Sequence, residues 1–325
     1  MNEKRLVDLK DWMKTFYSKD ISIEKASSDA SYRTYYRVEM NNETKIIMDA
    51  PPQFEPITSF LDISKRLENI NIHVPEIFEV DHNSGFILME DLGKINYLDK
   101  LNSDTVYCLY TDALDTIEKM QKDADITGLG IFDNSMLNEE MFLFKDWFLE
   151  RHLGLALSES DRSYLDICFN DISKKITEIP VSFVHRDYHS RNLIVTNKNN
   201  PGVIDYQDAV VGPITYDVVS LLKDCYIDWD NSLIDEMLKT FHNRIKSAHS
   251  KIQYKDFKLW FDITGLQRHL KAIGIFSRLN YRDNKSSYLD DIPRSYMYIE
   301  NIINKYDEFK GFKLIMSELN VINKI

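Results

Sequence analysis

The sequence of 325 residues contains little cysteine. Its three cysteines, Cys108, Cys168 and Cys225, are odd in number and far apart in the chain. A disulfide-stapled fold needs paired cysteines, and a zinc site needs cysteines clustered with other ligands. The spacing therefore argues against both, and each cysteine is expected to be a small buried hydrophobic residue. A reducing, cytoplasmic setting fits this use of cysteine.

Long apolar runs are also absent. No stretch reaches the roughly 18 apolar residues of a membrane-spanning helix. Residues 1–17 are charged throughout and have no apolar core of signal-peptide length. Their apolar residues instead recur at helical spacing, from Leu6 to Phe16, which predicts an amphipathic helix. No membrane partner is expected.

The sequence has no excess of basic charge. It contains 40 Lys and Arg against 52 Asp and Glu, a formal net charge of −12. Nucleic-acid-binding proteins usually carry a basic patch, so the acidic balance argues against nucleic acid as a partner. ATP is still compatible, because Mg²⁺ and a few local cations can neutralise its phosphates. The length favours two lobes over a single core.

The apolar pattern changes near residues 90–97. Before this point it predicts about five short strands and two helices, with Asn41-Asn42 as a hairpin turn. After it, helical spacing dominates, so the fold class is α+β with parts at 1–92 and 93–325. The expected strands lie in 21–50, 73–81, 85–93, 193–196 and 203–205, and the expected helices in 1–17, 56–70, 103–122, 138–153, 161–178, 215–226, 231–248, 256–279 and 293–308.

The short β segment inside the helical part carries the polar residues with the most chemical content. Asp187 lies on a loop, Asn192 opens one strand, and Asp205 ends the next. A hairpin brings its two open ends together, so these side chains are expected to lie close to one another. Hard oxygen ligands suit Mg²⁺, and a further carboxylate can accept a proton from a hydroxyl. This pattern predicts a phosphotransferase site.

Motifs in the same segment are similar to those of kinases. The pattern H-R-D-x-x-x-x-N occupies 185–192, and Ile204-Asp205-Tyr206 stands where protein kinases carry D-F-G. No glycine follows Tyr206 and no A-P-E segment occurs, which points away from protein kinases. Over essentially its whole length the chain resembles the aminoglycoside-phosphotransferase-like kinases, which share a bilobal protein-kinase-like fold.

Six longer segments narrow the resemblance within that family. They are SSDASYRTYYR (27–37), IIMDAPP (46–52), LMEDLG (88–93), VHRDYHSRNLIV (184–195), GVIDYQDAVVGPITYDVVSLLKDCY (202–226) and LQRHLKAIGIFSRL (266–279). In these segments the chain resembles the anomeric sugar kinases of bacterial cell-wall recycling, which phosphorylate the C1 hydroxyl of N-acetylmuramate and N-acetylglucosamine.

The resemblance implies roles for individual residues. Asp187 corresponds to the catalytic base, and Asn192 and Asp205 to the Mg²⁺ ligands. Residues 1–92 would form the nucleotide-binding lobe, and residues 93–325 the lobe with the catalytic loop and the substrate site. The cofactors implied are ATP and Mg²⁺.

The nucleotide is expected at two segments of the first lobe. The Ser-rich turn at 27–31 could cover the phosphates through its backbone N–H groups without glycine, although it also reads as an ordinary hairpin turn. The segment Met89–Gly93 corresponds to the hinge, whose backbone pairs with adenine. The nucleotide-binding candidates are Ser28, Asp29, Ala30, Ser31, Arg33, Arg37, Glu90 and Leu92.

One position departs from the kinase pattern. Asp49 stands roughly where kinases carry a phosphate-pairing lysine, and an aspartate cannot bind phosphate directly. Either Lys45, Arg33 or Arg37 supplies the positive charge, or Asp49 positions an arginine. Arg33 and Arg37 are the preferred candidates.

The sugar is expected beside Asp187, within the helical lobe. An arginine would suit the lactyl carboxylate of N-acetylmuramate, and Arg268 or Arg294 could supply it. Asp217 is expected to cap a helix start and to support the catalytic loop by hydrogen bonds. The substrate-binding candidates are His189, Arg191, Asp208, Asp224, Arg268 and His269.

Two other classes of function remain open at this point. A kinase of the same fold could act on another hydroxyl, such as that of an aminoglycoside, choline, homoserine or methylthioribose. A non-catalytic nucleotide-binding protein would share the fold without transferring phosphate.

Overall fold

The computed structural model describes residues 3–17, 22–28, 32–246 and 248–325, and its chain forms two compact units. The first unit contains residues 1–95 and 194–207, and the second contains 96–193 and 208–325. The sequence placed the boundary at 92/93 and assigned 194–207 to the second part. Contacts assign this segment to the first unit, because Val195 N–H donates to the Ile95 carbonyl and Val203 N–H to that of His73.

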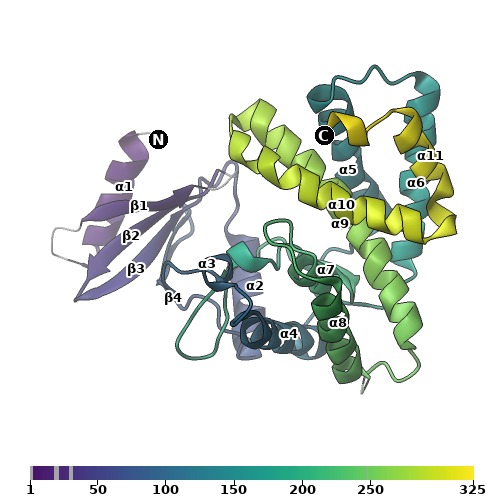
Figure 1. The fold of residues 1–325 in the computed structure, drawn as a ribbon. Helices are drawn as coiled ribbons and strands as arrows, with labels where there is room; N and C mark the ends of the chain where they lie inside the picture. The colour runs from purple at the N-terminus through teal and green to yellow at the C-terminus, as the bar shows by residue number, and fades with distance from the viewer. Residues whose placement is uncertain (1–2, 18–21, 29–31, 247) are drawn as a thin grey trace. The chain divides into compact units, whose positions relative to one another are not determined.

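The first unit is built on an antiparallel five-stranded sheet with strand order β1-β2-β3-β5-β4, in which β1, β2 and β3 can be followed side by side in Figure 1. Asn41 and Asn42 both adopt positive φ between β2 and β3, which is the geometry of the hairpin turn that the sequence predicted. The strands are β1 (Ile23–Ser28), β2 (Thr34–Met40), β3 (Glu43–Asp49), β4 (Ile77–Asp81) and β5 (Phe86–Glu90), and the helices are α1 (Glu3–Lys14) and α2 (Thr58–Asn69).

Helix α1 packs on one face of this sheet. Its Leu9 and Met13 are buried against side chains that alternate along the strands, including Val38, Ile47 and Leu88. Successive strand residues point to opposite faces. Ile46 and Met48 of β3 are therefore directed to the face opposite α1.

The second unit is mainly helical, and its longest helix, α9 (Tyr254–Asp283), is buried along most of its length. A Cβ added at Gly274 of α9 would lie 2.4 Å from the Leu143 carbonyl carbon, so glycine permits a close helix approach. The other helices are α3 (Tyr97–Lys100), α4 (Val106–Asp123), α5 (Asn134–Leu143), α6 (Glu159–Thr177), α7 (Tyr216–Leu222), α8 (Asn231–Ile245), α10 (Ile292–Lys305) and α11 (Lys310–Glu318).

Two short β pairs flank the loop at 185–192, which carries the candidate base. Strand β6 (Val181–Val184) pairs antiparallel with β9 (Val210–Pro213), and β7 (Leu193–Ile194) pairs with β8 (Gly202–Val203). The second pair is the hairpin expected from the sequence, but each strand has two residues and Asp205 lies beyond β8. The β6–β9 pair and α11 were not predicted.

The α+β class and most of the expected helices are confirmed. The expected helix 138–153 is divided into α5 and a π-helix at Phe144–His152. Cys225 is buried as expected, whereas Cys108 is exposed, so burial was wrong for that residue. Among the described residues, no helix has the length and apolarity needed to cross a bilayer.

Candidate active site

The loop between β6 and β7 is held in place by a buried carboxylate. Asp217 accepts hydrogen bonds from the backbone N–H groups of His185 at 2.8 Å and Arg186 at 3.1 Å. Arg186 has a φ of 77°, which a non-glycine residue rarely adopts without such support. The predicted support by Asp217 is confirmed. Its place was slightly wrong, because it lies in the first turn of α7 after the N-cap Thr215.

The pKa of Asp217 gives a first testable prediction. Burial, followed by the charge of Asp187, outweighs the two backbone hydrogen bonds and raises this pKa to about 7. The folded state then holds a proton that the unfolded state releases near pH 4, so this group's contribution to stability decreases as pH rises toward 7. Urea unfolding from pH 4.5 to 7 should show a decrease that is smaller in Asp217→Asn. Equal slopes for both proteins would contradict the assignment.

Asp187, the candidate base, is half-buried and lies among cations. Burial alone would raise its pKa, but Lys271, Arg186 and Arg268 outweigh burial and hold the pKa at about 2. Its backbone is also fixed: the N–H donates to His185 Nδ1 at 3.3 Å, and the carbonyl accepts from Asn192 Nδ2 at 3.0 Å. The side chain is therefore an anion at any pH near neutrality.

Sequence reasoning missed the charged cluster behind this loop. Glu140 of α5 accepts hydrogen bonds from Arg186 at 2.6 Å and Gln267 at 2.9 Å, and lies 3.0 Å from Lys271 Nζ. Burial would raise the pKa of Glu140, but Lys271 and Arg186 lower it below its ordinary value. Lys271 also contributes to the field at Asp187. No motif marks Glu140 or Lys271, because they become neighbours only through helix packing.

The two candidate metal ligands belong to different units. Asn192 is in the second unit, and its amide N–H is used by the Asp187 carbonyl. Asp205 is in the first unit with a φ of 65°, and its Oδ1 accepts from Gln207 Nε2 at 2.9 Å. A carboxylate and an amide oxygen are suitable ligands for Mg²⁺, which takes few protein ligands and keeps several waters. Among the described residues no cluster of three His, Cys, Asp or Glu forms a denser metal centre.

Several substrate candidates gather around the same loop. His189 packs edge-on against Tyr226, with ring centroids 5.3 Å apart. Asp224 accepts from the backbone N–H groups of Ser190 at 2.8 Å and Tyr226 at 3.0 Å. Arg191 stacks on Tyr226. These contacts bring three of the predicted side chains together.

Two other substrate candidates are buried and make contacts within the second unit. His269 is fully buried, with Nδ1 2.6 Å from the Gly265 carbonyl oxygen and Nε2 3.0 Å from that of Lys223. Both ring nitrogens face backbone carbonyls, which favours a structural role, and the substrate contact by His269 stays a prediction. Burial lowers its pKa to about 3. Arg268 is buried and donates to Ser220 Oγ.

For the remaining predicted site residues, the structure gives few side-chain contacts. Asp208 is exposed, and its carbonyl lies 3.5 Å from Arg186 Nη1. In the first unit, the Glu90 N–H donates to the Glu76 carbonyl, and Leu92 lies in the segment after β5. The backbone of Ser28 ends β1, whereas Asp29, Ala30 and Ser31 fall outside the described residues.

Both arginines proposed as phosphate ligands are engaged by carboxylates of their own unit. Arg37 Nε and Nη2 donate to the two carboxylate oxygens of Asp91, at 2.6 and 2.9 Å. Arg33 donates to Glu55 at 2.8 Å. A phosphate would have to compete with these ion pairs.

Asp49 pairs with an arginine that the sequence analysis did not name. Its side chain faces α1 and pairs with Arg5, which also donates to the Ser84 carbonyl at 2.7 Å and lies over the Phe86 ring. Strand alternation explains the difference, because Asp49 shares the face of Ile47 rather than that of Met48. Asp49 therefore fastens α1 to the sheet.

The ion pair between Arg5 and Asp49 gives a second testable prediction. Arg5→Met should reduce the free energy of unfolding by about 1–3 kcal/mol, because the Asp49 carboxylate would stay buried without its partner. Urea titration measures the change. Lys14→Met removes an exposed ion pair with Asp11 from the same helix and should leave the midpoint unchanged. Equal effects of the two substitutions would contradict the role of Arg5.

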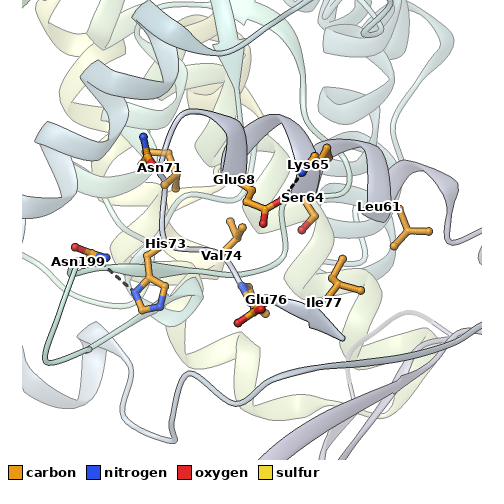
Figure 2. A pocket seen from close by; sticks show the side chains of 12 residues that line it. Leu61, Ser64, Lys65, Glu68, Asn71, His73, Val74, Glu76, Ile77 and Asn199 are labelled. Carbon is orange, nitrogen blue, oxygen red and sulfur yellow. Dashed lines mark hydrogen bonds and ion pairs between the residues drawn. The ribbon is translucent and has the colours of Figure 1, made fainter. Parts of the chain in front are cut away.

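A cavity of about 470 Å³ lies in the first unit, beside α2 (Figure 2). Its walls include Ser64, Lys65 and Glu68 of α2, together with His73 and Asn199. His73 Nδ1 lies 3.1 Å from the Asn199 carbonyl oxygen. None of the predicted site residues lines this cavity, so it is not the candidate active site.

Known proteins resemble the chain in sequence and in fold. A relative from Pseudomonas aeruginosa named N-acetylmuramate/N-acetylglucosamine kinase is 38% identical and matches over 90% of this chain and 87% of its own. A relative of the same name from Neisseria meningitidis is 32% identical, with coverage of 97% and 96%.

Among solved structures, a choline kinase from Streptococcus pneumoniae has a TM-score of 0.65 at 13% identity, covering 92% of this chain and 99% of its own. At this identity the likeness concerns the fold alone. The model of the phosphotransferase enzyme family matches residues 22–251, which include the whole catalytic loop. The chain therefore belongs to the phosphotransferase enzyme family.

Proposed function

We propose that this protein is an ATP-dependent kinase that phosphorylates the C1 hydroxyl of N-acetylmuramate, N-acetylglucosamine or both. The observation that carries the proposal is the name shared by relatives that are 32% to 38% identical over nearly the whole chain. The anionic Asp187 on its rigid loop supports the same reaction. We further propose that the enzyme acts in the cytoplasm, where ATP is supplied and peptidoglycan sugars are recycled.

Asp187 is suited to orient the acceptor and to take its proton late in the reaction. The C1 oxygen forms a bond to the γ-phosphorus as the bond to the β-phosphate oxygen breaks, and the proton passes to the Asp187 carboxylate. A pKa of about 2 makes Asp187 a weak base. Phosphoryl transfer through a loose transition state needs little activation of the nucleophile, so weak basicity is sufficient.

The low basicity of Asp187 also favours C1 as the position of transfer. The anomeric hydroxyl belongs to a hemiacetal, and the ring oxygen makes it more acidic than the primary hydroxyl at C6. A weak base therefore matches the C1 hydroxyl better than the C6 hydroxyl. Cations behind the loop keep Asp187 ionised before the sugar binds.

The other predicted site residues complete the proposal. Asn192 and Asp205 would hold Mg²⁺, which supplies neutralisation of the phosphate charge when bound. The first unit would hold ATP, with the backbone of Glu90 and Leu92 at the adenine. The phosphates would bind at the predicted turn, which contains Ser28, Asp29, Ala30 and Ser31. Arg33 and Arg37 would add positive charge there if they exchange their carboxylate partners for phosphate.

The test is phosphate transfer from ATP to each amino sugar, with ³¹P and ¹H NMR locating the phosphate. We expect ADP and a sugar 1-phosphate. A parallel panel contains an aminoglycoside, choline, homoserine and methylthioribose. Turnover of a panel member without turnover of either amino sugar would overturn the proposal, and phosphate on C6 would overturn its regiochemistry.

A further inference from the structure

Arg191 stands out among the cations near the catalytic loop because it is stacked and yet unpaired. Its guanidinium carbon lies 3.6 Å from the centroid of the Tyr226 ring and 5.5 Å from that of Tyr288. Within the described part of the chain, no carboxylate lies within ion-pair distance of this side chain. Stacking fixes the plane of the guanidinium and leaves its N–H edge available.

The other arginines near this loop already have partners. Arg186 pairs with Glu140, and Arg294 donates to Asp291 at 2.8 Å and to the Cys225 carbonyl at 2.6 Å. Arg268 donates to Ser220 Oγ and contacts the Cys225 sulfur. Arg268 and Arg294 were the arginines that the sequence suggested for a carboxylate. Both therefore already form contacts within the protein.

The surroundings of Arg191 contain a second group that lacks a partner. His189 Nδ1 is buried and has no hydrogen-bond partner among the described residues. Burial lowers the pKa of this imidazole, which also experiences the charges of Asp224, Arg268, Asp187 and Arg191. His189 therefore lies within electrostatic reach of both the candidate base and the stacked arginine. Among the described residues Asp224 forms no close ion pair with Arg191, and its oxygens accept hydrogen bonds from backbone N–H groups.

We propose that Arg191 binds the carboxylate of the lactyl ether of N-acetylmuramate and so favours this acidic sugar over neutral N-acetylglucosamine. The assignment rests on the proposed function and names the group that recognises one of its two substrates. A planar guanidinium can hold a carboxylate through two parallel hydrogen bonds, which a neutral sugar cannot form. Tyr226 and Tyr288 hold the guanidinium in place before the sugar arrives, which reduces the entropy lost on binding.

The experiment compares both sugars with three proteins: the unsubstituted chain, Arg191→Met and Arg191→Lys. Removing a charged hydrogen-bond partner should lower kcat/KM for N-acetylmuramate about 10- to 100-fold in Arg191→Met. The value for N-acetylglucosamine should change less than about twofold, because that sugar makes no such bond. Arg191→Lys should recover part of the lost kcat/KM for N-acetylmuramate, since lysine keeps the charge but lacks the paired N–H groups of the guanidinium.

Two controls separate this role from a structural one. The methyl ester of N-acetylmuramate has nearly the same shape without the charge, so the unsubstituted chain should use it with reduced kcat/KM and Arg191→Met should not discriminate against it. Arg151→Met removes another stacked arginine, 5.5 Å from the Tyr281 ring in the same unit, and should change neither sugar.

Distinct results would overturn the assignment. Equal losses of kcat/KM for both sugars in Arg191→Met would mean that Arg191 supports the fold. A raised KM for ATP with both sugars would mean that Arg191 binds phosphate. Unchanged turnover of N-acetylmuramate in Arg191→Met would also exclude the carboxylate-binding role of Arg191. Absence of turnover of either sugar by the unsubstituted chain would overturn the proposed function itself, and the assignment with it.

Discussion

Replacement of Asp187 by asparagine should lower kcat for the amino sugar about 10²- to 10⁴-fold, the usual contribution of a positioned general base. Asparagine has nearly the same shape but cannot accept the proton, and its carboxamide N–H₂ would face Lys271 and Arg186. The KM for ATP should change little. Because the pKa of Asp187 is about 2, the unsubstituted enzyme should show no loss of activity from this group between pH 5 and 8.

The measurement is the initial rate of ADP formation with saturating sugar, and NMR confirms the product. Asp123→Asn provides a matched control, because this carboxylate lies at the end of α4 and pairs only weakly with Lys119, 3.7 Å away. It should retain the full rate. If Asp187→Asn also retained the full rate, Asp187 would not be the base.

Local signals in the sequence were sufficient for most of the fold. Asparagine tolerates positive φ, so Asn41-Asn42 between two alternating segments predicted the β2–β3 turn that the structure contains. Apolar spacing likewise located helices such as α2 and α9 within a few residues. The β6–β9 pair was missed because its strands have four residues each and are separated along the chain by the catalytic loop.

The catalytic motif located Asp187, but not what surrounds it. Glu140 and Gln267 are 127 residues apart in the chain and meet only because α5 and α9 pack closely at Gly274. The same limit applied to Asp49, whose arginine partner lies 44 residues away in α1. Strand alternation directs the Asp49 side chain to the face that α1 covers, and no local signal in the sequence pairs it with Arg5.

Neutralisation of Glu140 should have the largest effect on stability. Glu140→Gln would leave Arg186 and Lys271 buried together without the carboxylate that lies between their charges. Breaking a buried ion pair by removing one partner costs about 3–5 kcal/mol. We therefore expect the free energy of unfolding to fall by about this amount, and the melting temperature by about 4–7 °C. Activity should also fall, because Arg186 belongs to the loop that carries Asp187.

Two further proteins test whether unbalanced charge is the cause. Glu150→Gln removes a carboxylate that pairs with the partly exposed Arg162, and should cost no more than about 1 kcal/mol. Glu140→Gln combined with Lys271→Met removes one charge of each sign, leaving Arg186 beside Asp187. This double variant should recover a large part of the stability lost in Glu140→Gln, because it leaves fewer unpaired buried charges.

The pH dependence provides an independent check on the same cluster. The pKa of Glu140 is lower in the folded protein than its ordinary value, so its stabilising contribution is present above that value and is lost as pH falls through the folded pKa. The difference in unfolding free energy between the unsubstituted chain and Glu140→Gln should therefore be full at pH 7 and shrink toward pH 3. A difference that stayed constant over this range would show that Glu140 stabilises the loop through packing rather than through its charge.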